Sequence, residues 1–351
     1  MLPLQEYDAR RIVLIKPSAL GDIIHSLPVL TALRQRFPAA HLAWVVNRSY
    51  APLLDGHPDL DEIVPFDRGR AGIAPMVLTS LRFLSRLHAQ RFDLAIDLQG
   101  LMRTGLMTLA TGAARRVGLA SAREGAAWAY TDCLAVSEPG MHAVDRYWLV
   151  AQALGVASQE IGFRLPIAPA AMQWALGRLR ELPRPWAVLC VGARWQTKRW
   201  PSQHFAAIAQ RTWQRFGGTT IFVGGPDEAL PARQTAAGLT GPVCNLVAKT
   251  TLPQLAAVLS LADIMIANDT GPLHLAVALG RPVVAPFLCT QVRLTGPYNR
   301  PRSTVATQVH CAGSLLKTCD RLECMSELTP ARLWPLVEEV LSKWKSANRC
   351  A

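Results

Sequence analysis

Residues 264–276 constrain the fold of this chain more than any other stretch. The apolar run 264–267 (Ile-Met-Ile-Ala) predicts a short buried strand, and the turn at 268–271 (Asn-Asp-Thr-Gly) ends it. Pro272 suits the first turn of a helix that continues to Gly280. This order of strand, glycine turn and helix leaves backbone N–H groups free at the carboxyl end of a sheet. Such a helix start attracts phosphate, because its unpaired donors and its dipole both favour an anion.

Two side chains of this stretch are candidate ligand-binding groups. Asp269 lies where a carboxylate could hold a sugar hydroxyl, and His274, one turn into the helix, could reach a phosphate oxygen. The alternative is an ordinary strand-to-helix junction, in which Asp269 or Thr270 caps the helix and His274 faces the core. Both interpretations stay open on this stretch alone.

The same order of strand, glycine-bearing loop, helix and strand occurs in both halves of the chain. In the first half we expect strands at 11–16, 41–46, 93–97 and 116–119, and helices at 23–37 and 142–155. A polar, proline-bearing segment at about 158–185 is the expected linker. In the second half we expect strands at 186–191, 219–223, 264–267 and 282–287, and helices at 202–216 and from Thr329 to about Lys345. This pattern predicts an α/β protein with two doubly wound domains that face each other across a cleft.

The charge of the chain is positive and uneven. The net charge is +12, and residues 171–351 supply +10 of it, with 20 basic against 10 acidic side chains. This excess suits an anionic ligand or membrane surface, and the lack of a basic run argues against nucleic acid. No stretch of 18 residues is free of charge and the N-terminus lacks an apolar signal region, so we expect a cytoplasmic protein.

Three loops carry side chains that suit group transfer. Asp22, in the loop after the first strand, could act as a general base or could cap a helix that begins at Ile23. Lys198 and Arg199 could neutralise the charge of a departing diphosphate, or could form a solvated basic loop. Glu228 could bind a ribose hydroxyl, or could be plain surface.

Metal and dinucleotide signals are weak. The Asp59-Leu-Asp61 spacing occurs in some metal-dependent transferases, but here it falls in a polar turn. His310, Cys311, Cys319 and Cys324 do not have the spacing of a structural zinc site. No Gly-x-Gly-x-x-Gly follows the first strand and no P-loop is present, which disfavours NAD binding and ATP hydrolysis.

Six motifs, in this order, resemble the bacterial heptosyltransferases of glycosyltransferase family nine. They lie at 16–28 (Lys-Pro-Ser-Ala-Leu-Gly-Asp-Ile-Ile-His-Ser-Leu-Pro), 97–100 (Asp-Leu-Gln-Gly, with Arg103), 198–201 (Lys-Arg-Trp-Pro), 224–228 (Gly-Gly-Pro-Asp-Glu), 268–274 (Asn-Asp-Thr-Gly-Pro-Leu-His) and 295–298 (Thr-Gly-Pro-Tyr). The resemblance covers nearly the whole chain. Two positions depart from the family pattern: Leu288 stands where the family usually has glycine in Phe-Gly-x-Thr, and Asn299 replaces a common glycine.

The resemblance implies a GT-B fold of two Rossmann-like domains. Residues 1–165 would bind the acceptor, residues 166–328 would bind the nucleotide sugar, and the terminal segment 329–351 would pack back on the first domain. The implied catalytic residues are Asp22, as the general base, and Lys198. The implied donor-binding residues are Thr197, Glu228, Asp269, Thr270, Gly271 and His274. The implied acceptor-binding residues are Ser18, Gly21, Arg48 and Arg103.

The reaction that the resemblance implies is an inverting transfer of heptose from ADP-heptose to the Kdo/heptose inner core of lipopolysaccharide. It needs no metal and no cofactor, and its partners are the ADP-sugar donor and a lipid-linked Kdo oligosaccharide acceptor. Two alternatives stay open: a family member with another nucleotide sugar or glycan acceptor, and a non-catalytic paralogue that binds nucleotide sugars.

The terminal segment adds a membrane hypothesis. Its basic residues Lys343, Lys345 and Arg349, together with Trp334 and Trp344, are typical of peripheral contact with the cytoplasmic face of the inner membrane. A terminal helix that docks on the protein explains the same residues.

Overall fold

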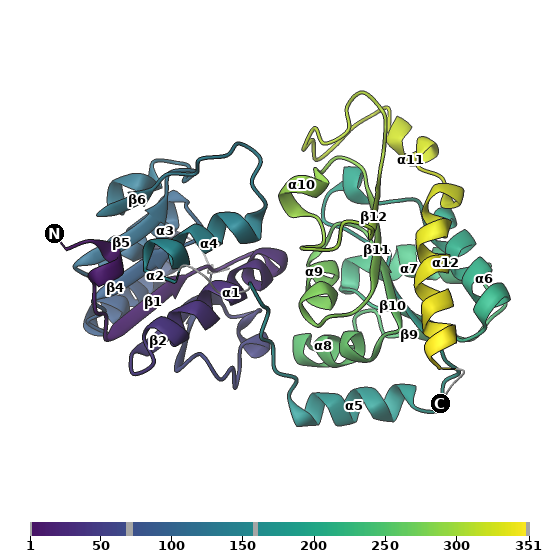
Figure 1. Ribbon diagram of the computed structural model, residues 1–351, viewed down its shortest axis with the longest axis horizontal. Helices are drawn as coiled ribbons and strands as arrows, with labels where there is room; N and C mark the ends of the chain where they lie inside the picture. The colour runs from purple at the N-terminus through teal and green to yellow at the C-terminus, as the bar shows by residue number, and fades with distance from the viewer. Residues whose placement is uncertain (1, 68–72, 157–160, 349–351) are drawn as a thin grey trace. The chain divides into compact units, whose positions relative to one another are not determined.

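The computed structural model describes residues 2–67, 73–156 and 161–348. Contacts along the chain divide it into two compact units, Met1–Pro166 and Ile167–Ala351 (Figure 1). Each unit is built around its own six-stranded parallel sheet. The arrangement of the two units across a cleft stays a prediction.

The first sheet has the strand order β3-β2-β1-β4-β5-β6. Its strands are β1 (Arg11–Ile15), β2 (His41–Asn47), β3 (Glu62–Phe66), β4 (Leu94–Asp97), β5 (Arg115–Leu119) and β6 (Asp132–Leu134). Strand β1 lies between β2 and β4, and its apolar run is buried almost throughout. Continuous burial of this kind is expected for a parallel strand that helices cover on both faces.

The second sheet repeats this order as β12-β11-β10-β7-β8-β9. Its strands are β7 (Trp186–Cys190), β8 (Thr219–Phe222), β9 (Val243–Asn245), β10 (Ile264–Ala267), β11 (Val283–Phe287) and β12 (Thr304–Ala306). Strand β10, the strand on which the sequence analysis centred, pairs with β7 and β11 and is fully buried. The doubly wound α/β organisation predicted from the sequence is therefore confirmed for each unit.

In each unit, helices connect most of the strands along the chain. The first unit has α1 (Leu20–Arg36), α2 (Ile73–Ala89), α3 (Met102–Ala110) and α4 (Ala143–Ala153). The second has α5 (Pro169–Leu179), α6 (Ser202–Phe216), α7 (Ala229–Ala236), α8 (Leu252–Leu261), α9 (Gly271–Ala278), α10 (Val292–Thr295), α11 (Glu323–Glu327) and α12 (Pro330–Ala347). Among the described residues, none of these helices combines the length and hydropathy needed to cross a bilayer.

The expected linker at 158–185 contains a helix. Pro169 occupies the first turn of α5, and the buried residues Ala171, Ala175 and Leu179 repeat at helical spacing. This face packs against α8, so most of the segment belongs to the second unit. The boundary between the two units therefore lies within the expected linker, but the later part of that segment is helical, because Pro169 begins α5 and does not break a helix.

Helix α12 packs within the second unit. It lies against α6 and strand β11, as Figure 1 shows, and its buried residues Leu333, Trp334, Val337 and Leu341 join the core of that unit. Trp334 is therefore a core residue, and its indole N–H donates to Glu338. The packing of the terminal segment on the first domain stays a prediction, and Arg349 lies outside the described residues.

Candidate active site

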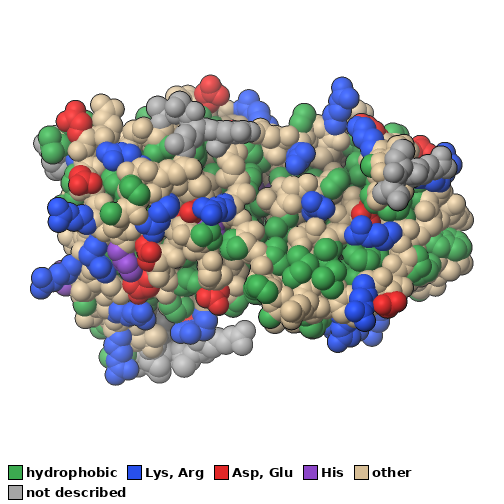
Figure 2. All heavy atoms as spheres, turned by 60° about the horizontal axis from the view of Figure 1, so that its bottom comes forward, with side chains coloured by type: hydrophobic (Ala, Val, Ile, Leu, Met, Phe, Trp, Pro, Cys, Tyr) green, Lys and Arg blue, Asp and Glu red, His purple; other side chains and the backbone are tan. Residues whose placement is uncertain are grey.

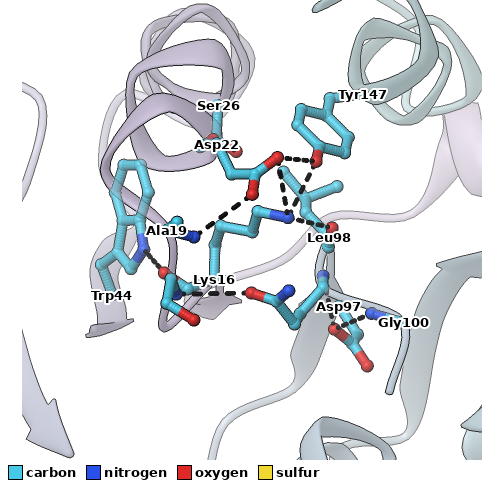
Figure 3. A network of polar contacts seen from close by, with 11 residues as sticks. Lys16, Ala19, Asp22, Ser26, Trp44, Asp97, Leu98, Gly100 and Tyr147 are labelled. Carbon is cyan, nitrogen blue, oxygen red and sulfur yellow. Dashed lines mark hydrogen bonds and ion pairs between the residues drawn. The ribbon is translucent and has the colours of Figure 1, made fainter. Parts of the chain in front are cut away.

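A buried lysine lies at the carboxyl end of β1 (Figure 3). Lys16 follows the strand directly, and its side chain is 2% exposed. Its Nζ donates to the Leu98 carbonyl (3.0 Å) and to the Tyr147 hydroxyl (2.8 Å), and it lies 3.8 Å from Asp22 Oδ1. Burial disfavours the ammonium, but the Tyr147 oxygen and the Asp22 carboxylate outweigh this effect and raise the pKa of Lys16.

Asp22 is the exposed member of this group. Its side chain is 39% exposed, its Oδ1 accepts a hydrogen bond from the Tyr147 hydroxyl (3.1 Å), and its Oδ2 accepts one from the Ala19 N–H (3.2 Å). Helix α1 begins at Leu20, so Asp22 is the third residue of the helix and not its N-cap. The capping alternative was wrong in position, although the carboxylate does bind the helix start. A carboxylate that solvent can reach is placed where it could accept a proton from a substrate.

The loop after β4 supports the same region. Buried Asp97 accepts hydrogen bonds from the N–H groups of Gln99 (2.8 Å) and Gly100 (3.0 Å) and from the Tyr130 hydroxyl (2.8 Å). Desolvation by burial raises the pKa of Asp97. The Gln99 side-chain oxygen accepts from the N–H of Ser18 (3.3 Å), so the motif at 97–100 helps to shape the first loop.

The two arginines predicted to bind an acceptor both contact Phe66, at the end of β3. The Arg103 guanidinium lies 5.7 Å from the centre of the Phe66 ring, and the Arg48 N–H donates to the Phe66 carbonyl. The Arg48 side chain is exposed and pairs with Asp67 (2.6 Å). Gly21 lies in the first turn of α1, beside Asp22.

A second ion pair lies at the carboxyl ends of β7 and β10. Lys198 Nζ is 2.7 Å from Asp269 Oδ2, and His274 Nε2 is 3.2 Å from Asp269 Oδ1. Burial alone would raise the pKa of Asp269, but the hydrogen bond with His274 and the charge of Lys198 lower it well below its usual range. The side chain of Asp269 is 4% exposed and that of Lys198 is 19% exposed, so the cation is the more accessible partner.

Helix α9 begins beside this pair. Thr270 occupies the N-cap position, but its hydroxyl donates to the Asn268 carbonyl and makes no capping hydrogen bond. Pro272 has no N–H, and the helix has no acidic residue in its first turn. The N–H of Gly271 and the helix dipole therefore make this helix start favourable to an anion. The alternative interpretation of Thr270 as the N-cap is thus correct in position, although its side chain makes no capping hydrogen bond.

Glu228 reaches this group of residues from the end of β8. Its Oε1 lies 4.0 Å from Cys190 Sγ, which is 3.9 Å from the Thr270 hydroxyl. A Cβ at Gly192 would lie 2.1 Å from Glu228 Cγ, and one at Gly224 would lie 1.8 Å from Oε2. The glycines therefore make room for this carboxylate, whose pKa is raised by burial. Glu228 is not plain surface.

Asn268, which the sequence showed only as a turn residue, connects two loops of the site. It is fully buried; its Oδ1 accepts from the Trp200 N–H (3.1 Å), and its Nδ2 donates to the Val191 carbonyl (2.9 Å). These bonds connect the loop that carries Lys198 to the turn that carries Asp269. Thr197, in the same loop, is buried, and its hydroxyl donates to the Leu316 carbonyl.

The two departures from the family pattern have local explanations. Asn299 has φ of 54°, in the left-handed region, where asparagine is the usual substitute for glycine. Leu288 is buried, 3% exposed, and packs in the core of the second unit.

Both carboxylates of the Asp59-Leu-Asp61 spacing are engaged by protein contacts. Asp59 binds Thr31 (2.9 Å) and Arg164 (2.9 Å), and Asp61 accepts from the Leu42 N–H (2.7 Å). Within residues 2–67, 73–156 and 161–348, no three His, Cys, Asp or Glu side chains lie close enough together to hold a metal ion. Metal independence itself stays a prediction.

A basic cavity lies at the opposite edge of the second sheet. It has a volume of about 690 Å³ and is lined by the segments that precede β10, β11 and β12 and by the last turns of α12. Its basic lining residues are Arg281, Arg300, Arg302 and Lys343, with Trp344 beside them. Arg300 and Arg302 are exposed, while Lys343 pairs with Glu339 (2.6 Å). Figure 2 shows Lys and Arg side chains spread over one face of the molecule.

Comparisons with known proteins define the class of this molecule. Its fold resembles solved structures of a family 9 glycosyl transferase from Veillonella parvula (TM-score 0.81, 22% identity, 97% of this chain and 99% of that one) and of Escherichia coli heptosyltransferase WaaC with ADP (TM-score 0.76, 27% identity, 94% and 99%). The two doubly wound sheets are therefore those of a GT-B glycosyltransferase.

The family follows from the sequence. The model of glycosyltransferase family 9 (heptosyltransferase) matches residues 80–325. Lipopolysaccharide heptosyltransferase 1 of Pseudomonas aeruginosa is 32% identical over 88% of this chain and 87% of its own length. The protein of the same name from E. coli K12 is 28% identical over 83% and 91%. The chain belongs to glycosyltransferase family 9 and is an enzyme of the heptosyltransferase class.

Proposed function

We propose that this enzyme transfers heptose from ADP-heptose to the Kdo/heptose inner core of lipopolysaccharide. The observation that carries the proposal is the Lys198–Asp269–His274 group beside the start of α9, on a chain whose similar solved structures include WaaC with ADP-2-deoxy-2-fluoro heptose (26% identity, TM-score 0.74). A fixed ammonium beside a free helix start suits a diphosphate.

The donor half of the reaction falls to the second unit. Lys198, the Gly271 N–H and His274 would hold the diphosphate and stabilise the charge that develops as the bond from C1 to the diphosphate oxygen breaks. Glu228 would bind the ribose of adenosine. Asp269 would bind donor hydroxyls while it stays paired with Lys198 and His274. Thr197 would contribute to donor binding from the loop that carries Lys198.

The acceptor half falls to the first unit. Asp22 would accept the proton of the acceptor hydroxyl while that oxygen forms its bond to C1 of heptose, and ADP would leave with the electrons of the broken bond. One in-line displacement inverts the configuration at C1. Arg48 and Arg103 suit the carboxylates of a Kdo-bearing acceptor, and Ser18 and Gly21 would line its site. The proposal assigns the charge stabilisation to Lys198, His274 and the start of α9, without a metal.

A coupled assay of ADP release tests this proposal. ADP-heptose and Kdo-bearing lipid A should give acceptor-dependent release of ADP, and the same assay with UDP- and GDP-linked sugars compares the other nucleotides. Asp22→Asn should lower kcat at least about a hundredfold. Release with a different nucleotide sugar would favour the alternative family member, and ADP binding without any release would favour the non-catalytic paralogue.

Peripheral contact with the cytoplasmic face of the inner membrane is a second part of the proposal. The cavity rimmed by Arg300 and Arg302 supports it, because these exposed cations complement anionic headgroups. Flotation at low salt should show binding to phosphatidylglycerol vesicles and not to phosphatidylcholine. Replacing both arginines by alanine should weaken it about thirtyfold, at about 1 kcal/mol for each charge. Arg178→Ala with Arg180→Ala removes equal charge elsewhere and should have no such effect.

A further inference from the structure

The buried Lys16 and Tyr147 have no role in the reaction as written, yet both contact the proposed base (Figure 3). A lysine ammonium has donors and no acceptor. The Tyr147 oxygen must therefore accept from Lys16, and its single proton is left for Asp22 Oδ1. The contacts form a directed chain from Lys16 through Tyr147 to Asp22.

The charge of each buried group in this series of hydrogen bonds follows from its surroundings. Burial raises the pKa of Tyr147 and so keeps its hydroxyl a donor, while the pKa of Lys16 is raised by its oxygen partners. The other charged groups near these two side chains are Arg146, beside Tyr147, and Asp97, beside Lys16. The Asp97 carboxylate is held by its own loop and by Tyr130, so Asp22 is the carboxylate to which the chain leads.

The geometry also fixes the orientation of the carboxylate. Tyr147 binds Oδ1 from α4 and the Ala19 N–H binds Oδ2 from the helix start, so both oxygens are restrained from opposite sides. An ionised carboxylate has about four lone-pair sites, and two partners leave others for a substrate. The 39% exposure of the side chain shows that these sites are accessible.

We propose that Lys16 and Tyr147 are positioning residues of the transferase, which orient Asp22 toward the acceptor hydroxyl. This inference rests on the proposed role of Asp22 as the base. The two residues act through the carboxylate, and neither contacts a substrate.

A double-mutant cycle tests the inference. Tyr147→Phe removes one oxygen and keeps the ring that packs over Lys16 (4.7 Å), so the fold should be retained. It should lower kcat about tenfold with the KM for ADP-heptose unchanged, because a hydrogen bond that orients the base has been removed. Lys16→Met should have an equal or larger effect.

The same changes in an Asp22→Asn background should alter kcat less than about twofold, because the group through which they act is gone. Equal losses in both backgrounds would show a merely structural role and overturn the inference. A Tyr147→Phe enzyme with the wild-type rate would also overturn it, whether or not Lys16→Met folds. Wild-type protein without acceptor-dependent ADP release would instead reject the proposed function.

Discussion

The two units contain the same kind of ion pair with opposite burial. In the first unit the lysine is 2% exposed and the aspartate 39% exposed; in the second the aspartate is 4% exposed and the lysine 19% exposed. Both pairs follow strands in sheets of the same order. One topology thus presents a carboxylate at one site and an ammonium at the other.

This difference fits two halves of a transfer reaction. A hydroxyl acceptor needs a base and a diphosphate needs a cation, and in each pair the buried partner holds the accessible one in position. The opposite charge of the buried partner also partly neutralises the accessible group.

The largest effect is expected at Lys198. Lys198→Gln should lower kcat/KM for ADP-heptose about 10²–10³-fold, because a fixed charge that stabilises the leaving diphosphate is lost. Steady-state kinetics checks this, with Lys249→Gln, an exposed lysine of the same unit, as the control. A similar loss in both variants would show that only the general positive charge matters.

Asp269 should affect stability as well as activity. Asp269→Asn leaves Lys198 without its buried counter-ion, so the free energy of unfolding at pH 7 should fall by about 3 kcal/mol. The pKa of Asp269 is lowered in the folded protein, so its contribution is complete above the ordinary pKa of about 4 and is lost as the pH falls further. In urea unfolding, the free energy of unfolding of the variant should lie far below that of wild type at pH 7. The difference should be smaller at pH 3. Exposed Asp227→Asn is the control, and a difference independent of pH would contradict the account.

Glu228 should have a smaller effect, confined to the donor. Glu228→Gln keeps the shape that Gly192 and Gly224 accommodate, and it should weaken ADP binding about tenfold by removing a charged hydrogen bond. Calorimetry with ADP measures this. Unchanged ADP affinity would remove Glu228 from the donor site.

Arg48 should have the smallest effect. Its ion pair with Asp67 is exposed, so Arg48→Ala should change the unfolding free energy by less than about 1 kcal/mol. The KM of a Kdo-bearing acceptor should rise a few-fold while the KM of ADP-heptose stays the same. A change in the donor KM would contradict the assignment of Arg48 to the acceptor.

The sequence predicted the central strands of both sheets, because buried parallel strands are continuous apolar runs such as 12–15 and 264–267. It also identified Lys198, Asp269 and His274 as candidate site residues, and these lie together in the structure. Helix α5 was missed because a proline can end or begin a helix.

Other features depend on contacts that spacing along the chain does not reveal. Lys16 follows an apolar strand and gives no sign that it is buried, and Tyr147 lies 131 residues further along. Asn268 was visible only as a turn residue, although its side chain connects two loops. The opposite burial of the two ion pairs is likewise a property of packing.

The central claim is that the first unit supplies the base and the second supplies the cation for the diphosphate. Calorimetric titration of ADP into wild type, Asp22→Asn and Lys198→Gln tests it directly. The account predicts that Asp22→Asn binds ADP within about twofold of wild type and that Lys198→Gln binds at least about tenfold more weakly, which is about 1.4 kcal/mol. Weakened binding in Asp22→Asn together with unchanged binding in Lys198→Gln would contradict it.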